Sequence, residues 1–301
     1  MVSFELRAGE TLGDGIHRIA EKEIDKVRGY ANGSPRGSRD EMVHEVRKSL
    51  KKLRTLLRLV RPALGGKTYR RENIALRDIA RPLTEVRDAA ILVEALDKTT
   101  KAHGPGSPRR SFRNVRTELV RHQRDVRGKI LTEEDAFKSV DSAIKDALVR
   151  LDDWADVKDK WSSVGEGVQR VYGRARRAFT AARQTPTVEH LHEWRKQSKY
   201  LRHQLELLRP LKPAVLGPLA SRTDRLGEIL GDDHDLAMLR REVAGDPERF
   251  GGAQAIAPLL GRIDHRREKL EDRAIVVGHT IFRRAPDDFV RRLHGYWKDW
   301  H

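Results

Sequence analysis

Apolar residues recur along the chain at intervals of three and four, which is the period of an amphipathic helix. Residues 43–60 follow this spacing without a break, and residues 191–208 do the same. No segment shows the sustained alternation of apolar and polar residues that marks a strand. The pattern therefore predicts an all-α protein.

Turn and capping residues divide this pattern into separate helices. The predicted helices cover residues 11–30, 38–61, 69–98, 110–130, 131–157, 158–184, 187–209, 214–244, 253–278 and 286–300. Ser38 or Asp40 can cap the second helix, and Thr187 can cap the seventh. Pro82 lies inside the third helix and predicts a kink or a break, whereas residues 103–108 are rich in glycine and proline and predict a linker.

One helical segment occurs twice. Residues 44–54 read His-Glu-Val-Arg-Lys-Ser-Leu-Lys-Lys-Leu-Arg, and residues 192–202 read His-Glu-Trp-Arg-Lys-Gln-Ser-Lys-Tyr-Leu-Arg, with a constant offset of 148 residues. We interpret the match as an internal duplication that builds two helical bundles related by a pseudo-two-fold axis. Repeat one is expected at about 10–130, an acidic connecting helix at about 131–157, and repeat two at about 158–301.

Each copy places its basic residues on one flank of the helix, beside the apolar seam. The two stripes consist of His44, Arg47, Lys48, Lys51, Arg54 and Arg58, and of His192, Arg195, Lys196, Lys199 and Arg202. Like charges at i,i+4 destabilise a helix, so an anion should compensate them. Two sources stay open: an anionic ligand, or carboxylates on neighbouring helices such as Glu23, Glu85, Asp88 and Asp235.

The overall charge favours the ligand. The 61 Lys and Arg residues outnumber the 45 Asp and Glu residues, which gives a net charge of +16 and predicts an anionic partner. The chain has no cysteine, which excludes disulfides, thiolate zinc sites and cysteine nucleophiles. It shows neither an apolar signal core nor an apolar run of membrane length, so we expect a cytoplasmic protein without a membrane partner.

The form of the stripes narrows the ligand class. A stripe of this length suits a linear polyanion, and the chain lacks the glycine-rich phosphate loop of nucleotide-binding proteins. No aromatic residues alternate with the cations, which disfavours sequence-specific nucleic-acid binding but leaves non-specific binding to a nucleic-acid backbone open. We expect no metal and no cofactor. A metal-dependent polyphosphate or triphosphate hydrolase stays open as an alternative, with residues 232–235 (Asp-Asp-His-Asp) as its only candidate metal cluster.

The paired His-x-x-Arg-x-x-x-Lys-x-x-Arg pattern resembles the CHAD family, the conserved histidine α-helical domain. Asp88 and Asp235 at matching positions and the closing segment 286–300 are also similar. The resemblance implies two four-helix bundles around a basic central cavity that binds inorganic polyphosphate without catalysis, on polyphosphate granules. It covers most of the chain and does not indicate an oligomeric state.

Carried over by motif position, the ligand residues are the ten His, Arg and Lys residues of the two motifs. Flanking helices should add further basic residues. Our choices there are Arg18, Lys22, Arg170 and Arg174, followed by Arg58, Arg77, Arg81, Arg222 and Arg225, which are placed by pattern and not by motif.

Overall fold

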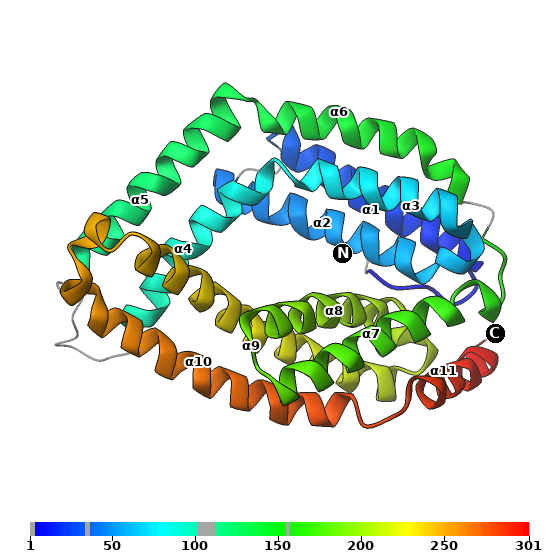
Figure 1. Ribbon diagram of the computed structural model, residues 1–301. Coiled ribbons are helices and arrows are strands. Elements are labelled where there is room, and N and C mark those ends of the chain that lie inside the picture. The colour runs from blue at the N-terminus through cyan, green and yellow to red at the C-terminus, as the bar shows by residue number, and fades with distance from the viewer. Residues whose placement is uncertain (1–3, 34–36, 102–111, 155–156, 301) are drawn as a thin grey trace.

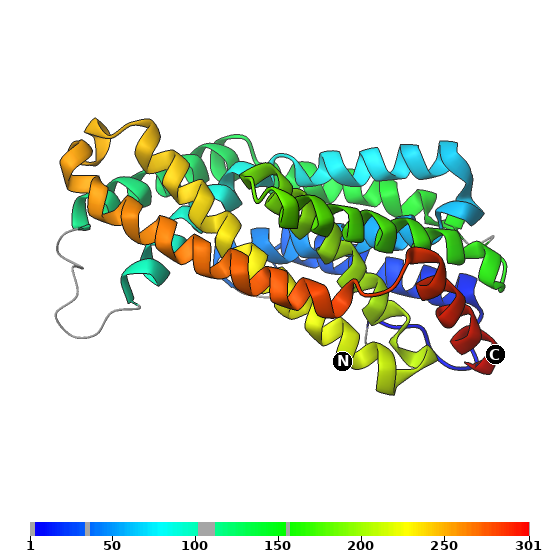
Figure 2. The same cartoon turned by 60° about the horizontal axis from the view of Figure 1, so that its bottom comes forward.

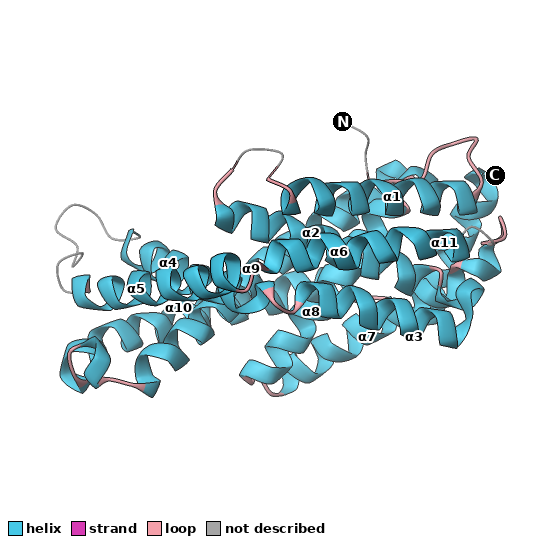
Figure 3. Cartoon of the chain, turned by 90° about the horizontal axis from the view of Figure 1, so that it is seen from above, coloured by secondary structure: helices cyan, strands magenta, loops and turns pink. Residues whose placement is uncertain are grey.

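The computed structural model describes residues 4–33, 37–101, 112–154 and 157–300, and these residues form helices and connecting loops without a strand (Figures 1 and 3). The α-helices are α1 (Leu12–Ala31), α2 (Arg39–Leu59), α3 (Arg61–Ala80), α4 (Leu83–Lys101), α5 (Arg113–Gly128), α6 (Ala136–Val149), α7 (Gly165–Gln184), α8 (Val188–Leu207), α9 (Pro213–Gly245), α10 (Ala253–Ile281) and α11 (Pro286–Trp300). Within these ranges, every helix is too short or too polar to span a bilayer.

The helix ends follow the capping residues in the sequence. The Ser38 hydroxyl accepts a hydrogen bond from the Glu41 amide, and the Thr187 hydroxyl accepts one from the His190 amide, both at 3.2 Å. The predicted break at Pro82 is confirmed, because α3 ends at Ala80 and α4 begins at Leu83. Near its start α3 is kinked at Gly65, whose φ of 74° suits a residue without a Cβ.

Two predicted helices are shorter than expected. The predicted helix 158–184 begins only at Gly165, after a 3₁₀ turn at Trp161–Ser163. The predicted connecting helix 131–157 contains a π-helical turn (Lys129–Glu133), α6 and a 3₁₀ turn (Arg150–Trp154). Its main part, α6, lies along α1 and α3. The predicted linker 103–108 is outside the described residues.

The helices form two groups that meet along α2 and α8. In the first group α2 packs against α1 and α3, and α6 covers α1 and α3. In the second group α8 packs against α7 and α9, α10 runs along α9, and α11 covers α7. Helix α4 packs against α2 and so belongs to the first group. The groups touch where α2 meets α7 and α8, where α3 meets α7, and again where α4 meets α9 (Figures 1 and 2). The two basic helices are therefore neighbours at the junction.

The apolar seams of the two basic helices fix their orientation. All of their members are buried: Val43, Val46, Leu50, Leu53, Leu57 and Val60 on α2, and Leu191, Trp194, Ser198, Leu201, Leu205 and Leu208 on α8. Burying a leucine or valine side chain stabilises a fold by about 1.5–3 kcal/mol. Rotating either helix about its axis would expose its seam, so each basic stripe is held on one side of its helix.

A close backbone contact joins the two groups. A Cβ on Gly167 of α7 would lie 2.0 Å from the Leu59 carbonyl oxygen at the end of α2, so only glycine fits. On the same helix, a Cβ on Gly173 would find its nearest neighbour at 3.6 Å, an ordinary contact distance. The first glycine therefore sets how closely α7 approaches α2, and the second does not.

We expect Gly167→Ala to destabilise the protein by about 2–3 kcal/mol, because the backbone of α2 or α7 must shift to admit the methyl group. Gly173→Ala is the matched control and should be neutral or stabilising by about 0.5–1 kcal/mol, because alanine favours the helix. Urea unfolding of both variants measures the difference. Equal stabilities of the two variants would contradict the close contact.

Candidate functional site

A cavity of about 1530 Å³ opens between the two helix groups. Its walls come from α2, α4, α8, α9 and α10. All ten residues of the repeated motif line it: His44, Arg47, Lys48, Lys51, Arg54, His192, Arg195, Lys196, Lys199 and Arg202. The structure thus brings together side chains that lie 148 residues apart in the sequence.

The lining carries an excess of positive charge. It contains thirteen Lys and Arg residues against seven Asp and Glu residues. Five of the cations lie outside the motif: Arg87, Lys98, Arg240, Arg241 and Arg267. The motif therefore supplies most, but not all, of the basic lining.

Neutral groups hold the arginines on the α2 side. The Arg47 guanidinium donates to the Thr84 hydroxyl at 2.6 Å and to the Ala80 carbonyl at 3.3 Å, where α3 gives way to α4. Arg54 donates to the Asn73 side-chain oxygen of α3 at 3.2 Å. These contacts orient the two guanidinium groups without neutralising them. Their charge remains available to an anion.

The α8 side combines paired and unpaired cations. Arg202 lies 2.9 Å from both Glu206 and Asp224. By contrast, the side chains of Arg195 and Lys199 form no hydrogen bond or ion pair with the residues that the structure describes, and the Arg195 Nε is buried without a partner. The side chain of Lys51 on α2 likewise has no such contact within the described ranges. Three cations from the two helices are thus crowded together without anions bound to them.

Burial and the neighbouring positive charges lower the pKa values of the two lysines. Burial lowers the pKa of Lys51 to about 8, with further contributions from the charges of Arg195 and Arg47. Burial and the same Arg195 charge lower the pKa of Lys199 to about 6. Both values lie below the ordinary value of 10.5, so the folded protein holds these protons less tightly than the unfolded chain does.

Two carboxylates of the lining offset part of the positive charge. Burial raises the pKa of Asp88 and of Asp235, although nearby arginines, chiefly Arg47 for Asp88 and Arg195 for Asp235, act in the opposite direction. One oxygen of Asp235 is buried without a hydrogen bond. Two of the four counter-charges considered from the sequence are therefore in the cavity, but they do not form direct ion pairs with the unpaired cations.

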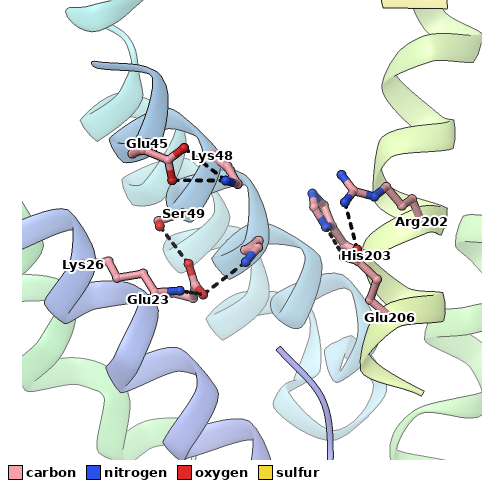
Figure 4. Close-up of polar contacts among 9 residues, drawn as sticks. Glu23, Lys26, Glu45, Lys48, Ser49, Arg202, His203 and Glu206 are labelled. Atoms are coloured by element: carbon pink, nitrogen blue, oxygen red, sulfur yellow. Dashed lines mark hydrogen bonds and ion pairs between the residues drawn. The ribbon is translucent and has the colours of Figure 1, made fainter. Parts of the chain in front are cut away.

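The other two candidate counter-charges, Glu23 and Glu85, do not compensate the basic residues that line the cavity. Glu23 is buried on a different side of α2, where it lies 2.6 Å from Lys26, 2.7 Å from the Ser49 hydroxyl and 3.3 Å from Lys52 (Figure 4). Glu85 is exposed and does not belong to the lining. The carboxylates of the protein therefore offset only part of the positive charge that lines the cavity.

The motif histidines stand in different surroundings. Burial and the Arg87 charge lower the pKa of His44, whose imidazole lies 3.9 Å from Glu45. His192 places its Nδ1 3.3 Å from the Nδ1 of His234 on α9, and burial and Arg195 lower the pKa of both rings, that of His234 to about 3. Both motif histidines are therefore biased toward the neutral form until an anion approaches.

Comparison with protein-family models identifies the family of the chain. The family model of the CHAD domain matches residues 18–244, which is most of the chain. The chain belongs to the CHAD family.

A solved structure shows the same fold. The crystal structure of the CHAD domain from the plant Ricinus communis matches with a TM-score of 0.59 and 17% sequence identity, and the match covers 98% of this chain and 95% of that chain. At this identity the match shows the fold alone. Among curated proteins, no sequence matches the chain.

The structure does not bring the flanking residues chosen from the sequence into the CHAD cavity. None of the following belongs to its lining: Arg18, Lys22, Arg170, Arg174, Arg58, Arg77, Arg81, Arg222 and Arg225. Arg18 pairs with Glu10 at 2.5 Å, and Arg170 pairs with Glu166 on its own helix. Arg58 stacks on the Tyr200 ring at 3.9 Å, and its Nη1 lies 3.0 Å from Asn73.

These residues lie on sides of their helices that do not line the cavity. Arg174, Arg222 and Arg225 are exposed, and so are Arg77 and Arg81 near the end of α3. A basic residue can satisfy a helical pattern on either flank of a seam, and only the packing of neighbouring helices decides which flank faces the cavity. Their role as ligands stays a prediction that the lining does not support.

Sequence reasoning also missed five cations of the lining. Arg87 directly precedes Asp88, so the position of this aspartate could have pointed to it. Lys98 lies ten residues, or nearly three helical turns, beyond the same aspartate and falls on the same side of α4. Arg240, Arg241 and Arg267 carry no such signal, because α9 and α10 reach the cavity only through their tertiary packing.

The acidic cluster at residues 232–235 is divided among separate contacts. Asp232 lies 3.1 Å from Lys98, Asp233 lies 2.8 Å from Arg267, and His234 faces His192. Within the described residues, no group of three or more His, Asp or Glu side chains is arranged to hold a metal ion. The cluster thus joins α9 to α4, α8 and α10.

We expect Lys199→Met to stabilise the ligand-free protein by at least about 1 kcal/mol at pH 6. The folded pKa of Lys199, about 6, lies below its unfolded value, so the unfolded chain binds more protons between these values and wild-type stability rises with pH. The advantage of the variant should therefore shrink as the pH is raised toward 10.

Denaturant unfolding across this pH range measures the effect, with Lys269→Met on the exposed side of α10 as the control. The control should follow the wild-type pH dependence. A Lys199→Met variant that is less stable than wild type at pH 6 would contradict the crowding of cations.

Proposed function

We propose that this protein binds inorganic polyphosphate in the cavity between its two helix groups and does not itself catalyse a reaction. The observation that supports the proposal most directly is the crowding of Lys51, Arg195 and Lys199. Among the described residues none of the three has an ion-pair partner, and burial together with the Arg195 charge lowers the pKa of both lysines. Phosphate oxygens would supply the missing acceptors and would relieve the repulsion.

The arrangement suits a linear ligand better than a compact one. Each motif covers eleven residues from its histidine to its last arginine, and these ten steps correspond to about 15 Å along a helix. Arginine offers forked donors and lysine offers a mobile charge, so successive phosphate groups can be held without a fixed register. Both walls of the cavity contribute, and a chain between them would contact α2 and α8 together.

Three structural expectations from the sequence are part of the same proposal. They are an internal duplication, two bundles related by a pseudo-two-fold axis, and a central cavity as the common binding site of the two repeats. The repeated motif supports them, because both of its copies line one cavity. A location on polyphosphate granules in the cytoplasm would follow from binding and is part of the proposal.

The contacts of α9 favour binding over hydrolysis. A polyphosphate hydrolase would need carboxylates gathered around a metal beside the phosphate. Asp232 and Asp233 are instead paired with Lys98 and Arg267. The lining also offers little for base stacking, because its one Phe, Tyr or Trp side chain, Tyr200, is covered by the Arg58 guanidinium.

We expect the double substitution Arg47→Gln with Arg195→Gln to weaken polyphosphate binding strongly. Each arginine that loses charge-assisted hydrogen bonds to phosphate should cost about 1.5–3 kcal/mol. Arg222→Gln with Arg225→Gln is the matched control, because it removes the same charge from exposed positions of α9 outside the cavity. Isothermal titration at fixed salt compares the two variants with wild type.

Three outcomes would count against the proposal. Equal losses in the two variants would mean that net charge alone drives binding. Displacement of long-chain polyphosphate by duplex DNA at equal phosphate concentration would favour a nucleic-acid partner. Release of phosphate from polyphosphate in the presence of Mg²⁺ or Mn²⁺ would favour the hydrolase.

A further inference from the structure

The helices α3 and α7 are strongly basic although their cations do not line the cavity. With Arg81 just beyond its end, α3 carries six Lys and Arg residues and two acidic residues. The helix α7 carries five arginines and one glutamate. A solvated helix face normally mixes the two signs, because like charges at i,i+3 and i,i+4 destabilise the helix. These two helices therefore need a reason for their excess charge.

The acidic residues of the two helices leave most of this charge uncompensated. Glu72 is buried and contacts Arg71 and Arg150, while Asp78 pairs with Arg77 and Glu166 with Arg170. Six cations remain exposed, and their side chains form no hydrogen bond or ion pair with any residue that the structure describes. Besides Arg81 and Arg183 near the ends of the two helices, they are Lys67 and Arg70 on α3 and Arg174 and Arg177 on α7.

The two helices are neighbours in space. They contact each other, and the start of α7 is held against the end of α2 at Gly167, next to the first turn of α3. Figure 3 shows both helices along the same side of the molecule. Their exposed cations therefore belong to one region of the surface, which we call the outer basic face and define by Lys67, Arg70, Arg174 and Arg177.

The outer basic face adjoins the cavity through α3. Asn73 accepts a hydrogen bond from Arg54, and the Ala80 carbonyl accepts one from Arg47. One side of α3 thus touches the basic stripe of α2, and the exposed cations lie on the adjoining side, since Arg70 is one helical turn before Asn73. Arg77 and Arg81, beside Ala80, lie exposed where α3 ends near the cavity wall. A flexible polyanion that leaves the cavity here would meet positive charge along α3.

We propose that the outer basic face is a second polyanion-binding surface, which holds the part of a long polyphosphate chain that extends beyond the cavity. This inference rests on the proposed function of the cavity. Polyanions bind exposed cations mainly by releasing counterions, so the outer basic face adds affinity for each phosphate group that reaches it. Ligands short enough to stay within the cavity gain nothing from it. The outer basic face thus makes affinity depend on chain length.

The test compares a short and a long ligand. In the outer variant Lys67, Arg70, Arg174 and Arg177 are changed to Gln, which keeps a good helix former at each position. The control variant changes Arg124, Lys138, Lys269 and Arg273 to Gln, which removes the same charge from exposed positions of α5, α6 and α10. Tripolyphosphate and long-chain polyphosphate are titrated at several salt concentrations, and thermal unfolding confirms that each variant is folded.

We expect the outer variant to bind tripolyphosphate like wild type and to bind long-chain polyphosphate on the order of tenfold more weakly, with a smaller salt dependence. The control should match wild type for both ligands. Unchanged binding of the long chain, or equal losses of affinity for the two ligands, would overturn the inference. A control variant that loses as much affinity as the outer variant would also overturn it.

Failure of the proposed function would give a different result: wild type would bind neither ligand, or the Arg47–Arg195 variant would bind both normally.

Discussion

Repulsion among cations that are held together by apolar packing is the constraint on which this structure depends. The seams of α2 and α8 are buried along their whole length, so neither helix can turn its basic stripe away from the other. The stripes meet in one cavity, where burial and the charge of Arg195 lower the pKa of both Lys51 and Lys199. Hydrophobic burial thus stabilises an arrangement that electrostatics opposes.

Such an arrangement is poor for stability and good for binding. A protein selected for stability alone would place carboxylates against these cations, as Glu23 does on another side of α2. Inside the cavity Asp88 and Asp235 provide only partial compensation, since neither forms a direct ion pair with the unpaired residues. The positive charge that has no anionic partner in the protein can then bind an anionic ligand, and we propose that this ligand is polyphosphate. The outer basic face extends the same principle to the surface.

The sequence predicts the parts of this account that depend on local spacing. Steps of three and four residues identify the seams, and the stripe beside each seam follows from helical geometry, so all ten motif residues are found in the lining. Ser38 and Thr187 begin the basic helices as their capping chemistry requires. Pro82 marks the break between α3 and α4.

The remaining parts of the site depend on packing between helices, which spacing does not report. Arg18 satisfied the pattern but faces Glu10, whereas Arg240 and Arg267 reach the cavity from helices with no recognisable motif. The close approach of α7 to α2 could not be placed from composition either, because it depends on the contact between Gly167 and Leu59. A single sequence thus defines the faces of individual helices, and their tertiary arrangement defines which faces share a cavity.

The central claim is that Lys51, Arg195 and Lys199 lack anionic partners in the cavity, and proton uptake on binding tests it most directly. Bound phosphate should raise the lowered pKa values of Lys199 and Lys51, so the complex holds more protons than the free protein. Titration calorimetry with tripolyphosphate at pH 7.5, in buffers of different ionisation enthalpy, should show an uptake of about one proton that falls in Lys199→Met. Binding without proton uptake, or an uptake unchanged in this variant, would contradict the account.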